Sequence, residues 1–246
     1  MRKLILAAAL AALAPSGAYA FHPLIGEDTA YLGRDVKQAE LGFEHAVTRD
    51  GARLTTNAGT AELSYGLFDK VDLLMSAVWH GWTSHGLSRS GLGDVALETK
   101  FPVGEKAGWE FSLKPGFSLP AGDEGRSLGA GKGGVWVYGV AGRRTGPWEC
   151  YLNAVYLLNR NTLNERENVL KGSAAAARQL APDFKGTAAL FAETNRDKAS
   201  FSTPVSAALG LIWSPYQTLD LDAGLKLGLT KAAPDEALLL GLTLRM

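Results

Sequence analysis

The sequence predicts an all-β protein: a transmembrane, antiparallel, up-and-down β-barrel of about 12 strands with a polar lumen. Three observations predict this class. A short apolar leader starts the chain, no long apolar helix follows it, and apolar and polar residues alternate with a period of two almost throughout. The alternating segments are about ten residues long, which is the length that a tilted strand needs to cross a bilayer.

Residues 1–20 have the pattern of a signal peptide. Arg2 and Lys3 precede an apolar run, and Ala18-Tyr19-Ala20 supplies the small residues of a cleavage site, so we expect the mature chain to begin at Phe21. No later run of about 18 apolar residues could form a membrane helix. An exported chain of this kind is either soluble in the periplasm or inserted in an outer membrane as a closed barrel.

Twelve segments are predicted as strands because successive strand residues point to opposite faces. The segments, in chain order, are 40–45, 61–65, 71–80, 94–101, 109–119, 134–144, 148–158, 168–180, 184–193, 205–214, 219–230 and 238–246. We expect residues 21–35 to form an N-terminal segment at the periplasmic mouth, as a candidate plug, and 36–246 to form the barrel.

The clearest segment is 219–230, where leucines and Ala223 alternate with charged or small residues. Segment 134–144 is apolar on both faces, so its parity stays open. Segment 168–180 contains Ala174–Ala177, which helix propensity favours as a helix. Its length suits a strand, and we count it as one.

Alternation alone does not say which face meets lipid, because a soluble sandwich or barrel has the same period. Connection length favours the membrane, since outer-membrane barrels have short periplasmic turns and longer external loops. Short turns are expected near 68–69, 104–106, 145–147, 181–183 and 214–216, and longer external stretches at 48–54, 84–91, 121–133, 159–168, 195–204 and 231–236.

Aromatic residues provide a second indication, because rings prefer the two lipid–water boundaries. Trp82 and several other rings also fall near strand ends, and the residues predicted to lie at the membrane interface are Tyr65, Trp79, Trp109, Trp148, Tyr156, Trp213 and Tyr216.

Charged residues of both signs fall on the face opposite the leucines, as a crowded, hydrated lumen requires. The residues predicted to line the pore are Glu40, Glu44, Glu62, Asp94, Glu98, Lys100, Glu110, Lys114, Lys185, Glu193, Asp220, Asp222 and Lys226, with Lys171 near them. Two interpretations remain open: a structural network that holds the wall, or a selectivity lining.

Two motifs carry a resemblance to a known family: His22-Pro23-Leu24-Ile25-Gly26-Glu27-Asp28-Thr29 and Ser90-Gly91-Leu92-Gly93-Asp94-Val95-Ala96-Leu97. With the barrel pattern, they resemble the phenol-degradation meta-pathway family of outer-membrane barrel proteins, often labelled "transporter". The resemblance covers essentially the mature chain and implies a barrel that passes small molecules, hydrophobic or aromatic ones among them. Such barrels usually end in an aromatic residue that the outer-membrane assembly machinery reads. This chain ends at Met246, after Leu240, Leu242 and Leu244.

Candidate catalytic and metal sites have little support in the sequence. His80 and His85 lie near Ser84 and Asp94, but no Gly-x-Ser-x-Gly motif accompanies them. His22 could hold copper with the mature amino terminus, although Pro23 removes a backbone nitrogen that could assist.

The glycine-rich stretch 122–134 resembles a phosphate cradle, but a strand follows it where such a cradle needs a helix. We read it as a flexible external loop, and Cys150 as an inert lone thiol. We therefore predict no catalytic residues, no metal and no cofactor.

Equal numbers of basic and acidic residues, 25 of each, argue against nucleic-acid binding. The predicted function is passive diffusion of small molecules through a monomer in the outer membrane, with lipid, solute and assembly machinery as partners. The alternatives are a non-transporting barrel with a role in adhesion or assembly, a membrane-embedded hydrolase, and a soluble periplasmic binding protein.

Overall fold

A computed structural model describes residues 26–49 and 53–246 of the chain. The predicted signal peptide, the cleavage site and His22 lie outside these residues. The described chain forms twelve strands: β1 (Lys37–Thr48), β2 (Leu54–Phe68), β3 (Val71–Ser84), β4 (Leu87–Lys106), β5 (Trp109–Leu119), β6 (Val135–Thr145), β7 (Trp148–Leu158), β8 (Asn168–Ala181), β9 (Phe184–Glu193), β10 (Val205–Tyr216), β11 (Leu219–Gly228) and β12 (Glu236–Arg245).

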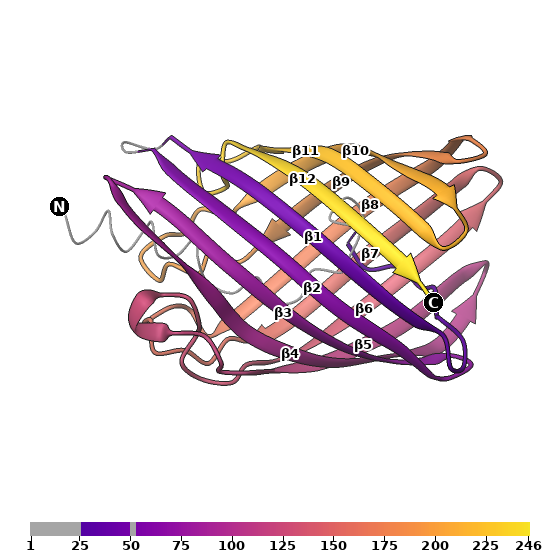
Figure 1. The fold of residues 1–246 in the computed structure, drawn as a ribbon, viewed down its shortest axis with the longest axis horizontal. Coiled ribbons are helices and arrows are strands. Elements are labelled where there is room, and N and C mark those ends of the chain that lie inside the picture. Colours follow the sequence, from indigo (N-terminus) through magenta and orange to yellow (C-terminus); the bar gives the residue numbers. More distant parts are fainter. Residues whose placement is uncertain (1–25, 50–52) are drawn as a thin grey trace.

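The strands close into one antiparallel barrel in which each strand pairs with its neighbours in sequence. Closure comes from β1 and β12, which pair in a register that places Phe43 opposite Leu240. The backbones of Lys37 and Met246 exchange two hydrogen bonds of 2.8 and 3.1 Å at the end of this pair. Figure 1 shows the tilted strands and the C-terminus at one end of the barrel. The predicted fold class is therefore confirmed.

The outer face of the barrel is apolar, as predicted. Leu225 is 61% exposed and Leu209 66% exposed, and both belong to the sides that the alternation assigns to lipid. Exposing such a surface to water is unfavourable by about 25 cal/mol per Å². A closed barrel with an apolar outside satisfies its backbone hydrogen bonds in a membrane, so the soluble alternative is wrong. Among the described residues, no helix is long and apolar enough to span a membrane.

Two segments that the sequence left uncertain are resolved. In β6, Trp136, Tyr138 and Val140 are buried, whereas Val135 and Val137 are exposed. The inner face of β6 is therefore apolar and aromatic. The alanine-rich stretch is strand β8, because its backbone pairs with β7 on one side and β9 on the other.

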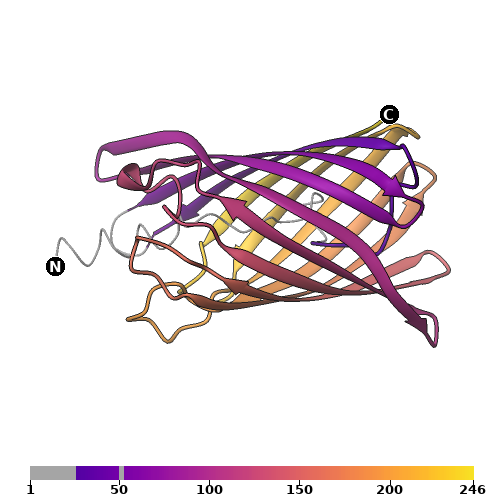
Figure 2. The same cartoon turned by 90° about the horizontal axis from the view of Figure 1, so that it is seen from below.

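The connections alternate in length, with one correction. Two-residue turns join the strands at the end where the C-terminus lies, and longer loops gather at the other end, as Figure 2 shows. The stretch 84–91 was expected to be a long external loop. It is instead a continuation of β3 and β4 that turns at His85 and Gly86 alone. Both residues have positive φ values, 50° and 77°, which permits a tight hairpin turn that follows the strand twist.

Candidate functional site

The first described residues lie inside the barrel, close to its short-turn end (Figures 1 and 2). Glu27 forms ion pairs with Lys114 of β5 and, at 3.6 Å, with Lys100 of β4. Asp28 forms a further pair with Lys100 at 2.8 Å. Because Glu27, Lys100 and Lys114 are taken out of water, each requires a partner of opposite sign. The pairs hold the segment against the inner wall.

Lys114 is the centre of this network and is 0% exposed. Its Nζ atom lies 3.2 Å from a carboxylate oxygen of Glu98 and 5.4 Å from the centroid of the Tyr138 ring. The other oxygen of Glu98 accepts a 2.7 Å hydrogen bond from the indole nitrogen of Trp136. The network therefore joins the N-terminal segment to β4, β5 and β6.

Further hydrogen bonds attach the rest of residues 26–36, which we call the N-terminal segment. The Thr29 hydroxyl donates to Glu110 at 2.6 Å, and the Tyr31 hydroxyl lies 2.5 Å from that of Ser112. The backbone nitrogen of Leu32 donates to Asp72 at 3.3 Å. The contacts reach three strands, β3, β4 and β5, and the Asn153 amide of β7 adds a bond to the Glu27 carbonyl at 3.1 Å.

Gly66 of β2 allows the segment to turn into β1. Its carbonyl accepts a 2.8 Å hydrogen bond from the backbone nitrogen of Asp35, and its own nitrogen donates to the carbonyl of Val36 at 2.9 Å. A side chain at Gly66 would collide with the carbonyl of Gly33. Glycine is therefore required for this close backbone approach.

The structure places every predicted pore-lining residue on the side of its strand that faces away from lipid. Those that are buried are Glu40, Glu62, Asp94, Glu98, Lys100, Lys114, Asp220 and Asp222. Those that are half-buried are Glu44, Glu110, Lys185, Glu193 and Lys226.

Most of these charges are brought together in pairs of opposite sign. Lys226 contacts Glu44 at 2.6 Å, and Lys185 contacts Glu149 at 2.8 Å. Lys171 lies 3.4 Å from Glu193, while Asp220 pairs with Arg245. Glu149 and Arg245 were not predicted as site residues, although their parity placed them on the inner face.

A cavity of about 380 Å³ lies between the N-terminal segment and the barrel wall. We call it the inner chamber. The segment contributes Glu27, Asp28 and Tyr31 to its wall, and β1 and β2 contribute Glu40 and Glu62. A space of this volume accommodates a compact small molecule.

At the long-loop end, Asp94 holds the longest connection in place. One carboxylate oxygen of Asp94 accepts from the backbone of Gly122 at 3.0 Å, and the other accepts from Ala130 at 2.9 Å. The loop side chain Leu128 is buried against β4. The loop 120–134, which contains a single short helical turn (Glu124–Arg126), is thus pinned by a side chain of the inner wall.

Two further loops meet beside it. The guanidinium of Arg196 lies 4.0 Å from the carboxylate of Glu165, and both side chains are buried. Burial raises the pKa of the Glu165 carboxyl above its ordinary value, while Arg196 and a hydrogen bond from Asn159 oppose the rise.

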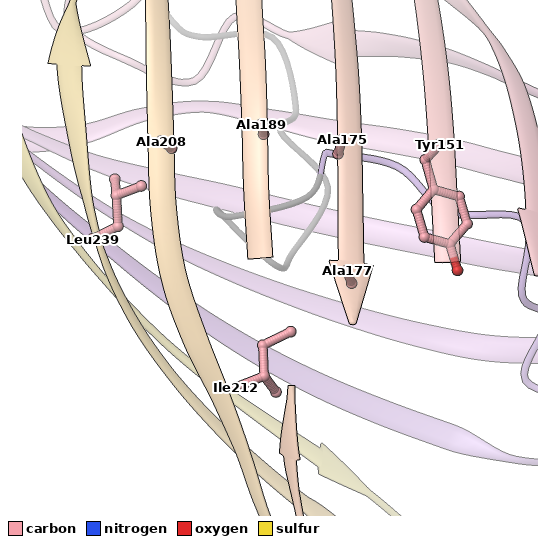
Figure 3. Packing of buried hydrophobic residues seen from close by; sticks show 7 residues of the cluster. All are labelled: Tyr151, Ala175, Ala177, Ala189, Ala208, Ile212 and Leu239. Atoms are coloured by element: carbon pink, nitrogen blue, oxygen red, sulfur yellow. The ribbon is translucent and has the colours of Figure 1, made fainter. Parts of the chain in front are cut away.

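The inner face also carries two clusters of buried apolar residues that sequence reasoning missed. The first, which we call the aromatic wall, consists of Ala96, Trp136, Tyr138, Val140, Val155, Leu157 and Val169. The second consists of Tyr151, Ala175, Ala177, Ala189, Ala208, Ile212 and Leu239, shown in Figure 3. The signal was present in residues 134–144, where apolar residues on both faces mean that the lumen side is apolar too.

The predicted interface aromatics divide between the two ends. Tyr65, Trp109, Trp148, Trp213 and Tyr216 lie toward the short-turn ends of their strands, and Trp79 and Tyr156 toward the long-loop ends. Trp213 stacks on Phe184 with ring centroids 6.1 Å apart. Trp82 differs from the expectation, because it is buried against Leu54 on the inner face.

The histidines near the rim do not form a catalytic arrangement. His80 is buried, and its Nε2 atom has no hydrogen-bond partner. Both oxygens of Asp94 are occupied by loop backbone, and His85 forms the β3–β4 turn. Within 26–49 and 53–246, no three His, Cys, Asp or Glu side chains are grouped so as to hold a metal ion.

The fold and the charged interior together define the class of protein to which this chain belongs. A closed twelve-stranded barrel with an apolar outside and paired charges inside is an outer-membrane β-barrel of the porin-like type. The chain belongs to the family described as "Putative MetA-pathway of phenol degradation", whose model matches residues 26–246. The protein is therefore placed in the outer membrane.

Solved structures share this fold at low sequence identity. An outer membrane channel from Pseudomonas putida F1 is 15% identical with a TM-score of 0.73, and the match covers 89% of this chain and 98% of the other. The NanC porin is 9% identical with a TM-score of 0.57, covering 85% and 100%. The β domain of the Bordetella autotransporter BrkA is 16% identical with a TM-score of 0.51, covering 85% and 98%. No curated protein matches the sequence.

Proposed function

We propose that the protein is a passive channel through which small molecules, including hydrophobic and aromatic ones, diffuse across the outer membrane. The observation that carries the proposal is the division of the inner surface. The aromatic wall lies mainly on β6, β7 and β8, whereas Glu40, Glu62 and Asp220 lie on β1, β2 and β11. In the strand order of the barrel, these two groups stand on opposite sides of the lumen, while Glu98 and Lys114 of β4 and β5 border the aromatic wall.

Such a lumen gives an apolar solute an apolar side to pass along, while the opposite side carries charged groups. A polar lining alone would favour ions and sugars. The matching structure from Pseudomonas putida F1 bears the name of a channel, and this name supports the proposal by analogy of fold.

We further propose that the N-terminal segment is a plug that narrows the passage. It lies inside the lumen and is held by the ion pairs that Glu27 and Asp28 form with Lys114 and Lys100. The thirteen pore-lining residues named above would then act around it, and the seven interface aromatics would anchor the barrel at the two membrane boundaries.

The test is uptake of a radiolabelled aromatic solute by porin-deficient cells that express the protein. We expect faster uptake than in cells with an empty vector. Leu157→Gln keeps the side-chain size but makes the aromatic wall polar, and it should slow aromatic uptake several-fold. Swelling of proteoliposomes in arabinose should be unchanged by Leu157→Gln. Uptake equal to the empty vector, with no swelling, would contradict the channel.

A non-transporting role in adhesion has less support. The external loops are ordered by Asp94, Glu165 and Arg196, but nothing in these contacts identifies a partner.

A further inference from the structure

The wall of the inner chamber carries an excess of negative charge. Seven carboxylates line it, against four cationic side chains. Three of these cations are already in ion pairs with wall carboxylates: Lys100 with Asp28, Lys185 with Glu149, and Arg245 with Asp220. The fourth, Arg144, lies 3.7 Å from Glu110, which is not among the wall residues.

Two of the wall carboxylates are placed side by side by strand register. Glu40 of β1 is the direct cross-strand partner of Glu62 of β2. Side chains in such positions have Cβ atoms about 4.5–5.5 Å apart, and like charges there are destabilising. The repulsion is stronger in an enclosed space than in bulk water, because screening is weaker.

Glu62 is only 2% exposed, and its carboxyl group is incompletely hydrogen-bonded. One carboxylate oxygen accepts a hydrogen bond from the Ser64 hydroxyl at 3.2 Å, while the other has no hydrogen-bond partner. Lys114 attracts Glu62 electrostatically, but it is already in contact with Glu27 and Glu98. A buried carboxyl oxygen that faces a cavity and lacks a hydrogen-bond partner, beside a second carboxyl group, points to a positively charged occupant.

The residues that line the chamber favour an organic cation over a metal ion. No metal-binding group of three occurs in the described part of the chain, and the volume exceeds that of a bare ion. Tyr31 and Tyr151 add aromatic rings to the same wall, and aromatic rings attract organic ammonium groups. We propose that the inner chamber binds a small organic ammonium ion between the Glu40–Glu62 pair and these tyrosines.

The probe is tetramethylammonium chloride, titrated calorimetrically into the detergent-solubilised mature protein. We expect saturable binding of one ion per chain. The neutral molecule tert-butanol, of similar shape, should not bind. Glu62→Gln and Glu40→Gln should each weaken binding about tenfold or more. Glu105→Gln, at the exposed short-turn end of β4 and outside the chamber, is the matched control and should bind like the unaltered protein.

Folding of each variant is checked by heat-modifiable migration in gels, and two separate variants keep the test decisive if one does not insert. The proposal is overturned if tetramethylammonium does not bind, if all variants bind it equally, or if potassium displaces it at equal concentration. Because the measurement is of binding, it is independent of permeation. A protein that binds the ion but transports nothing contradicts the proposed channel, whereas one that transports without binding contradicts only this proposal.

Discussion

Lys114 of β5 and Glu27 of the N-terminal segment form an ion pair inside the barrel although 87 positions separate them in the chain. Lys114 has no exposed surface, so its charge depends on Glu27 and Glu98 for compensation. The pair connects the position of the N-terminal segment to the charge balance of the lumen, and four predictions follow from this connection and from the rest of the barrel.

Glu27→Gln should loosen the N-terminal segment. The substitution removes one partner of a buried cation, a change that costs about 3 kcal/mol or more, although Glu98 remains as a partner. Single-channel recording in planar bilayers should show a larger or more often open conductance. The control is Glu105→Gln, and unchanged conductance in Glu27→Gln would show that the segment does not limit passage.

A disulfide should lock the segment in place. A Cβ atom built at Gly26 would lie 3.1 Å from the Ser173 hydroxyl oxygen, a spacing compatible with disulfide geometry. In a Cys150→Ser background, Gly26→Cys with Ser173→Cys should cross-link on oxidation and keep conductance low, even with Glu27→Gln present. Reduction should restore the higher conductance. Each single cysteine variant should be insensitive to oxidant, and a cross-linked protein that still conducts like Glu27→Gln alone would speak against a plug.

Asp94→Asn should release the loop 120–134. The carboxylate accepts two backbone hydrogen bonds, and bonds to a charged group contribute about 1.5–3 kcal/mol each. Trypsin should then cut faster after Arg126 and Lys132, which are exposed in this loop. Glu124→Gln changes an exposed carboxylate of the same loop and should leave the cleavage rate unchanged. Equal cleavage of both variants would mean that Asp94 is not the anchor.

An arginine on the lipid face should destabilise the barrel according to depth. Leu209→Arg lies near the middle of β10 and should reduce the free energy of unfolding by about 2–4 kcal/mol. Leu229→Arg, just beyond the end of β11 and also exposed, should cost about 0–1 kcal/mol. Urea unfolding in lipid vesicles measures both. Equal effects at the two positions would contradict the membrane placement of the strands.

The alternation of apolar and polar residues was sufficient to predict most of the strands. The parity of β9, β10 and β11 could be predicted because each residue of a strand points to the face opposite its neighbour. It failed at β6, where both faces are apolar. It also failed at the β3–β4 turn, where a long external stretch was predicted over 84–91, whereas positive φ values at His85 and Gly86 allow the two strands to continue.

The sequence by itself determined that the strands of this chain alternate between an apolar and a charged face, because the period of a strand is a local property. It also placed the charged residues on the inner side. Only the tertiary structure decided which charges meet. Glu27 reaches Lys114, and Glu40 stands opposite Glu62, because barrel closure and strand register set distances between residues that sequence spacing does not encode.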